Sequence, residues 1–309
     1  LRENNFLGKG QKVKFDTSFS NTRTAYDISL TEPYFNNKPL SLTTNLYSNF
    51  TDPTGVNYET EDLGFGLSTS FPLSLDRHLE LRYSFFTTEI NANSNATAYE
   101  NALAGTDTVS SLGYSLSLDR RNSRYKPSNG YNLRLSQDLA GIGGDSYYYR
   151  NDFEFNYYKR LSKRFIGAYK LRGGNINGYN DKYSPLSSNF KLGGKKLRGF
   201  KSGKIGPKLA NSYTGGQYFY LTSLETNIDL NIDAFDITTT AFIDVGSVWG
   251  LENPAYGSID DKHEARSSIG VNFNWDSAIG PINIIYANII KSNKNDTTDN
   301  LYFDIGYNF

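Results

Sequence analysis

Residues 112–119 read Leu-Gly-Tyr-Ser-Leu-Ser-Leu-Asp, so large apolar side chains alternate with small or polar ones. A period of two places successive side chains on opposite faces of a β-strand. The same alternation runs through residues 79–85 and 268–275, and weaker versions occur along the whole chain, whereas a helical period is nowhere sustained. The pattern predicts an all-β protein of about fourteen strands.

The composition favours strands that face lipid on one side and water on the other. The 309 residues include 24 Tyr and 20 Phe, yet the mean hydropathy is −0.55 because Ser, Thr, Asn and Gly dilute the rings. No stretch approaches the roughly 18 consecutive apolar residues of a transmembrane helix. A transmembrane barrel strand needs only about 10 residues that alternate apolar-out and polar-in. The sequence therefore predicts an antiparallel transmembrane β-barrel, with a soluble β-sandwich or β-helix as the alternative.

Charge and residue content exclude several classes of function. The chain has 32 Lys+Arg and 32 Asp+Glu, so no basic excess favours nucleic acid as a partner. It has no Cys, which excludes disulfides, thiol nucleophiles and Cys-ligated metal sites. With two His and no Gly-x-Ser-x-Gly motif, a Ser/His/Asp hydrolase site has few ways to form. We therefore expect a protein that is not an enzyme and that uses no cofactor and no metal.

The connections between the predicted strands alternate between short and long, as they do in outer-membrane barrels. Short turns are predicted at residues 36–39, 161–164 and 278–281, and long polar connections at residues 91–107, 250–263 and 175–215. A connection as long as the last is unusual in a compact domain unless it is itself functional. We therefore expect residues 175–215 to carry the functional site.

The last predicted strand is amphipathic and ends on an aromatic residue. One face is predicted to carry Leu301, Phe303, Ile305, Tyr307 and Phe309, and the other face Tyr302, Asp304, Gly306 and Asn308. This ending resembles the C-terminal recognition signal of bacterial outer-membrane proteins. We expect the apolar face of this strand to direct insertion of the chain into the membrane.

One motif in the longest connection is specific to a family. Residues 193–200 read Gly-Gly-Lys-Lys-Leu-Arg-Gly-Phe, and residues 205–207 read Ile-Gly-Pro. They resemble the (Val/Ile)-Arg-Gly-(Phe/Tyr) loop signature of the BamA-type outer-membrane β-barrel assembly family, here with Leu197 in first place. The match continues in order through residues 215–216, 223–225, 242–249 and 277–281, and earlier through residues 32–35 and 124–130. The resemblance covers nearly the whole chain.

The resemblance implies that this loop enters the barrel lumen, where Arg198 meets acidic residues of the inner wall. Strand parity places Asp244 and Glu225 on the face opposite their apolar neighbours, so both are expected partners. A guanidinium can bind two carboxylates with a bidentate geometry that Lys cannot reproduce. Gly199 is expected to allow a tight turn, because only Gly adopts positive φ without steric cost, and Phe200 to act as an apolar anchor.

The resemblance also implies an activity. Members of the family act as insertases that fold and insert other β-barrel proteins, without nucleotide hydrolysis, through a lateral seam between their first and last strands. Residues 301–309 would form one side of that seam. We therefore expect unfolded outer-membrane β-barrel clients and outer-membrane lipids as partners, and the bacterial outer membrane as the location. Lipoprotein assembly subunits would dock through the periplasmic POTRA domains of the family.

Residues 1–309 are predicted to form one barrel domain. Residues 5–10 resemble the segment that follows the first two strands of a family barrel, which has about sixteen strands, an even number. A count of about fourteen strands implies that the first two strands, and the POTRA domains before them, are missing.

Two other functions remain open at this point. One is a translocation pore of the two-partner-secretion or TamA-like type, although residues 200–207 look more like the BamA branch. The other is a passive porin channel. A porin would conduct steadily in a bilayer, whereas a barrel that is plugged by a loop is expected to give small, erratic currents.

Overall fold

The computed structural model describes residues 1–52, 57–209, 212–229, 237–251, 259–277 and 280–305. Tyr307 and Phe309 of the predicted insertion signal lie outside these residues. Among the described residues, no helix is long and apolar enough to cross a membrane.

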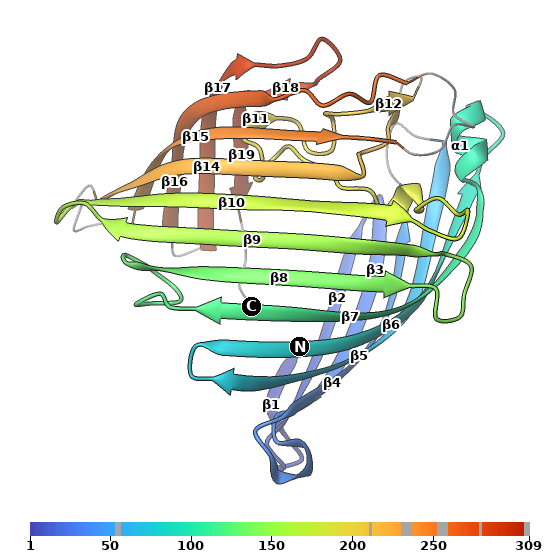
Figure 1. Cartoon of the computed structure of the whole chain (residues 1–309), viewed down its shortest axis with the longest axis horizontal. Helices are drawn as coiled ribbons and strands as arrows, with labels where there is room; N and C mark the ends of the chain where they lie inside the picture. The colour runs from blue at the N-terminus through green and yellow to red at the C-terminus, as the bar shows by residue number, and fades with distance from the viewer. Residues whose placement is uncertain (53–56, 210–211, 230–236, 252–258, 278–279, 306–309) are drawn as a thin grey trace. The chain divides into compact units, whose positions relative to one another are not determined.

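Within the described residues, fifteen strands form one antiparallel sheet in sequence order (Figure 1). They are β1 (Arg2–Phe6), β2 (Gln11–Ser20), β3 (Arg23–Glu32), β4 (Ser41–Thr51), β5 (Tyr58–Ser74), β6 (Arg77–Ala92), β7 (Gly105–Asp119), β8 (Gly130–Ala140), β9 (Tyr148–Arg160), β10 (Phe165–Gly178), β14 (Tyr218–Asp229), β15 (Ile237–Trp249), β16 (Arg266–Ser277), β17 (Gly280–Lys291) and β19 (Leu301–Ile305). The all-β prediction is confirmed.

Small elements occupy the connections. Two short ladders pair β11 (Gly199–Phe200) with β18 (Thr298–Asp299) and β12 (Lys208–Leu209) with β13 (Ser212–Tyr213). The helical segments are α1 (Ala98–Leu103) and the 3-10 turns η1 (Phe35–Asn37) and η2 (Leu186–Ser188). The connection between β10 and β14 is therefore built from short ordered pieces.

The main sheet has one strand more than the sequence predicted, and that strand is β1. Its residues, Arg-Glu-Asn-Asn-Phe, have no alternation of apolar and polar side chains, and all five are exposed. The strand exists because its backbone pairs with β2, with Arg2 opposite Lys14 and Phe6 opposite Gln11. Backbone pairing of this kind leaves no period-two signal in the sequence.

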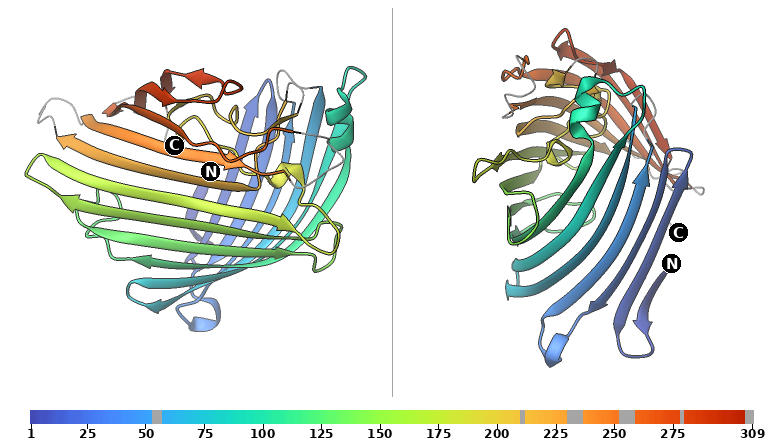
Figure 2. Two further views of the ribbon diagram at one scale, coloured as in Figure 1. Left: turned by 45° about the horizontal axis from the view of Figure 1, so that its top comes forward. Right: turned by 90° about the vertical axis from the view of Figure 1, so that its right-hand side faces the viewer.

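The chain divides into two compact units. The first comprises Leu1–Leu118, Leu135–Asn151 and Ile176–Ser188. Its early strands, drawn from blue to teal, lie side by side in both views of Figure 2. A half-buried ion pair is part of its interior: the Arg82 guanidinium donates to Asp138 at 2.8 and 2.6 Å and to the Ser115 hydroxyl at 2.6 Å.

The second unit comprises Asp119–Arg134, Asp152–Asn175 and Asn189–Phe309. Its strands β14 to β17 have two unlike faces. We call the face that carries Ser223, Asp244 and Ser268, all buried, the inner face. The opposite, outer face exposes apolar side chains, with Leu224 59% and Ile243 43% exposed. A sheet with this distribution keeps polar groups inside and offers apolar side chains outward, as a lipid-facing barrel wall does.

The Glu100 carboxylate of helix α1 ties the connection between β6 and β7 to Asn57, the residue before β5. Glu100 accepts hydrogen bonds from the backbone N–H of Thr97 at 2.8 Å and of Asn57 at 2.9 Å, and the Thr97 hydroxyl accepts from the Glu100 N–H at 3.2 Å. This is a capping box, to which a distant backbone donor has been added. The N–H donors, first Thr97 and then Asn57, lower the pKa of Glu100 to about 2.

We expect this connection to open in acid. A carboxylate whose pKa is lowered in the folded state stabilises that state above its ordinary pKa of 4.5, and the stabilisation is lost as the pH falls from there to about 2. Protection factors of the Thr97 and Asn57 amides against hydrogen exchange should therefore fall over that interval. Glu100→Gln should lower them at neutral pH by about tenfold, since a charge-assisted hydrogen bond is lost.

Glu59→Gln, an exposed position on β5, is the matched control and should leave both amides protected. If Glu100→Gln left both amides as well protected as they are in the wild-type chain, the carboxylate would not be what closes the connection.

Candidate functional site

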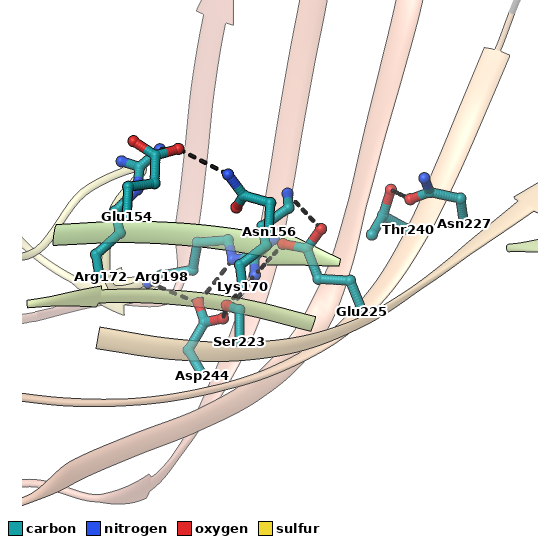
Figure 3. A network of polar contacts seen from close by, with 10 residues as sticks. All are labelled: Glu154, Asn156, Lys170, Arg172, Arg198, Ser223, Glu225, Asn227, Thr240 and Asp244. Carbon is teal, nitrogen blue, oxygen red and sulfur yellow. Dashed lines mark hydrogen bonds and ion pairs between the residues drawn. The ribbon is translucent and has the colours of Figure 1, made fainter. Parts of the chain in front are cut away.

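The Arg-Gly-Phe motif lies against the inner face of the sheet. Arg198 stands in the connection between β10 and β14, and its guanidinium reaches the side chains of β14 and β15 (Figure 3). β14 and β15 are paired, with Ser223 opposite Asp244. That register places Ser223, Glu225 and Asp244 together under the loop.

The guanidinium of Arg198 is bound by two carboxylates. Its Nε and Nη2 donate to the two oxygens of Asp244 at 2.7 and 2.6 Å, and Nη2 also donates to Glu225 at 2.8 Å and to the Ser223 hydroxyl at 3.1 Å. The backbone N–H of Arg198 donates to Asp244 at 3.2 Å. The side chains are 8% exposed for Arg198, 7% for Glu225 and 0% for Asp244. The arrangement is a bidentate, charge-assisted contact that is shielded from water.

A second cation makes the cluster neutral. The Lys170 ammonium, from β10, lies 2.6 Å from the second oxygen of Glu225. Two cations thus face two carboxylates. Desolvation lowers the pKa of Arg198, but the hydrogen bonds and charges of Asp244 and Glu225 outweigh it and raise that pKa, so the guanidinium stays charged. We call Lys170, Arg198, Ser223, Glu225 and Asp244 the loop anchor.

Two further contacts hold Arg198 in place. Its Cζ atom lies 3.5 Å from the centroid of the Phe242 ring, a cation–π contact on a buried side chain. The Ser268 hydroxyl of β16 donates to the Arg198 carbonyl at 2.6 Å. Phe242, Ser268 and Lys170 were not among the partners of Arg198 predicted from the sequence. Strand parity was the available signal for Phe242, since it shares the inner face with Asp244.

The neighbours of Arg198 fill the space between loop and sheet. Leu197 and Phe200 are buried, with 0% and 1% exposed. Gly199 has a φ of +92°, and a Cβ added there would lie 2.7 Å from Ile289 Cδ1 and 3.1 Å from Ala287 Cβ. Gly199 thus provides both a positive φ and a close approach to β17.

The loop is also tied to the connection between β17 and β19. Gly199 pairs with Asp299 and Phe200 with Thr298, which forms the β11–β18 ladder. That connection is fixed in turn by a buried ion pair, in which Arg266 Nε and Nη2 donate to Asp296 at 2.9 and 3.0 Å. No local pattern predicts this pair, because Arg266 and Asp296 belong to segments that only the fold brings together.

The last strand contacts the loop as well. β19 pairs with β17, with Leu301 opposite Tyr286 and Ile305 opposite Ile282. Leu301 and Phe303 are exposed on the outer face, as the alternation predicted. From the loop, Lys195 donates to Asp304 at 2.5 Å, and this hydrogen bond raises the pKa of Lys195.

The described part of the chain has no group of three metal-ligating side chains.

Comparison with known families decides the family of this chain. The Omp85 superfamily domain matches residues 5–309. The chain belongs to the Omp85 superfamily. Family membership agrees with the sequence-based prediction that the chain is not an enzyme.

Relatives of this Omp85 chain come from bacteria and animals. It is 28% identical over 264 residues to the outer membrane protein assembly factor BamA of Neorickettsia risticii (strain Illinois), a match that covers 84% of this chain and 35% of that protein. It is 30% identical over 227 residues to the sorting and assembly machinery component 50 homolog of Bos taurus, which covers 72% of this chain and 48% of that protein. The chain thus spans between a third and a half of the length of these relatives.

Solved structures share the fold. BamA from Haemophilus ducreyi lacking POTRA domains 1–3 matches with a TM-score of 0.86 at 23% identity, over 98% of this chain and 65% of that one. CdiB from Acinetobacter baumannii matches with a TM-score of 0.63 at 13% identity, over 97% of this chain and 54% of that one. The predictions of a BamA-type family, an antiparallel barrel fold and an outer-membrane location are confirmed.

Proposed function

We propose that this Omp85 barrel folds and inserts other β-barrel proteins into the outer membrane through a lateral seam that includes β19. The observation that carries the proposal is the loop anchor, because it fixes the family's signature loop to β14 and β15. The names of two relatives, an outer membrane protein assembly factor and a sorting and assembly machinery component, support the same activity.

The mechanism follows from the cost of an unpaired strand edge. Backbone N–H and C=O groups without partners are very costly in hydrocarbon, so a barrel with a weak seam gains by pairing with an incoming strand. The client strand would add to the edge by β-augmentation and then be released as its own barrel closes. Leu301, Phe303, Ile305, Tyr307 and Phe309 would belong to the strand that opens. The loop anchor would keep the neighbouring wall rigid while the seam moves.

The partners in this proposal are unfolded outer-membrane β-barrel clients and outer-membrane lipids. Lipoprotein subunits would join through POTRA domains, as the resemblance implies. The reaction is a change of conformation and environment, so it requires no cofactor and no nucleotide.

Reconstitution in liposomes tests the proposal. An unfolded outer-membrane barrel should acquire heat-resistant mobility on a gel several times faster with this protein than with empty liposomes. Arg198→Ala should slow that rate, whereas Lys14→Ala, which removes an exposed ion pair with Asp16 on β2, should not. Rates equal to those of empty liposomes, together with steady ion currents, would contradict the proposal and favour a translocation pore or a porin.

A further inference from the structure

A large cavity lies beside the loop anchor. Its volume is about 710 Å³, and its walls come from β9, β10, β14 to β17, the connection between β7 and β8, and the signature loop, all within the second unit. Cavities of roughly 300–1,000 Å³ are the usual size for ligand sites. The cavity is therefore large enough to receive several residues of an extended chain.

The lining of the cavity is strongly basic, although the chain as a whole has equal numbers of basic and acidic residues. Nine Lys and Arg side chains line it, against one carboxylate, that of Glu225. Several of these cations have partners: Arg198 and Lys170 bind Glu225, Arg172 binds Glu154, and Lys195 binds Asp304. The basic excess is thus only partly neutralised by the protein.

Four cations of the lining have no side-chain partner among the residues that the structure describes. Arg160, Lys163 and Arg164 surround the turn between β9 and β10, and Lys196 comes from the signature loop. All four are exposed. A concave surface of one charge sign concentrates anions and raises their association rate, in a way that depends on ionic strength.

From this lining we infer that the cavity binds an acidic, extended polypeptide segment, namely the carboxylate-rich part of an unfolded client chain. The inference rests on the proposed function for the identity of the client. The wall between the cations carries amides and hydroxyls, including Asn227, Thr240 and Asn272, which can pair with a peptide backbone. Lipid is the poorer fit, because the cavity opens from the inner face, whereas the exposed apolar side chains Leu224 and Ile243 point to the outer face.

Peptide binding to the whole chain in phosphatidylcholine nanodiscs tests the inference. The probe is a fluorescent peptide of alternating Asp and Ser, compared by anisotropy with one of Asn and Ser. The acidic peptide should bind more tightly, and the difference should shrink at high salt. Replacing Arg160, Lys163, Arg164 and Lys196 together by Gln should weaken its binding about 16-fold, a factor of two for each cation removed.

The matched control replaces Lys9, Lys12, Lys38 and Arg77 by Gln, an equal change of charge at exposed positions outside the cavity, and should bind as the wild type does. Equal affinity for both peptides, or equal losses in both variants, overturns the inference. Displacement of the peptide by inorganic phosphate of the same total charge, or by phosphatidylglycerol in the nanodisc, also overturns it, in favour of a simple anion or a lipid headgroup.

The client assay separates this inference from the proposed function. If the chain binds the acidic peptide selectively but does not speed insertion, the inference about the cavity stands and the proposed function is contradicted. If the chain speeds insertion but binds both peptides alike, the proposed function stands and the inference about the cavity is contradicted.

Discussion

Arg198→Ala is expected to destabilise the chain by about 3–5 kcal/mol, the cost of removing one partner from a buried ion pair. Asp244 is fully buried, and among the described residues the cation that contacts it is the Arg198 guanidinium, so the variant leaves its charge unpaired. Glu225 keeps its ion pair with Lys170, so its charge stays partnered in the variant. The free energy of unfolding in urea, measured in micelles, reports the loss. Trypsin cleavage after Lys195 and Lys196 reports whether the loop has left the sheet.

Three variants test the cause of this loss. Arg198→Lys keeps the charge but cannot contact both carboxylates in the same geometry, so its cost should be intermediate. Adding Asp244→Asn to Arg198→Ala should recover part of the lost stability, because the buried negative charge is removed. Arg172→Ala removes a pair that is 45% exposed on the Arg side, and should cost about 0–1 kcal/mol. A double variant no more stable than Arg198→Ala would exclude the buried charge as the cause.

The barrel wall was predictable from the sequence because its signal is local. Alternation identified fourteen of the fifteen strands, and parity alone placed Asp244 and Glu225 on the same side of the sheet. The family motif then identified Arg198. Each of these inferences uses residues that are close in sequence, where the period of two is sufficient.

The rest of the site depends on pairings between distant segments. Lys170 meets Glu225 because β10 and β14 are neighbours, with Ala168 opposite Glu225, although the longest connection separates them. Phe242 departs from the alternation of polar inner and apolar outer side chains, because it places a large apolar ring on the inner face. Its contact with the Arg198 guanidinium explains that position. The Arg266–Asp296 pair and the β11–β18 ladder likewise join separate connections. No local pattern encodes such contacts.

Gly199→Ala is expected to cost about 2–4 kcal/mol, the sum of a backbone term and a packing term. Alanine must adopt the φ of +92°, and its Cβ would meet Ile289 Cδ1 at 2.7 Å and Ala287 Cβ at 3.1 Å. Ile289 can rotate away, but the Ala287 Cβ is fixed to β17. The loop must therefore move outward, which would stretch the hydrogen bond from the Ser268 hydroxyl to the Arg198 carbonyl. Urea unfolding and trypsin cleavage at Lys195 and Lys196 would detect both effects.

Gly203→Ala separates the two terms, because it lies in the same loop with a φ of +68° and its nearest atom to a new Cβ is Lys191 Cδ at 3.7 Å. It should show only the backbone cost of about 1–2 kcal/mol. Adding Ile289→Val to Gly199→Ala removes the methyl group in closest contact and should restore part of the packing term alone. Equal losses in Gly199→Ala and Gly203→Ala would mean that close approach to β17 contributes nothing. The positive φ of the turn would then be the whole reason for glycine beside Arg198.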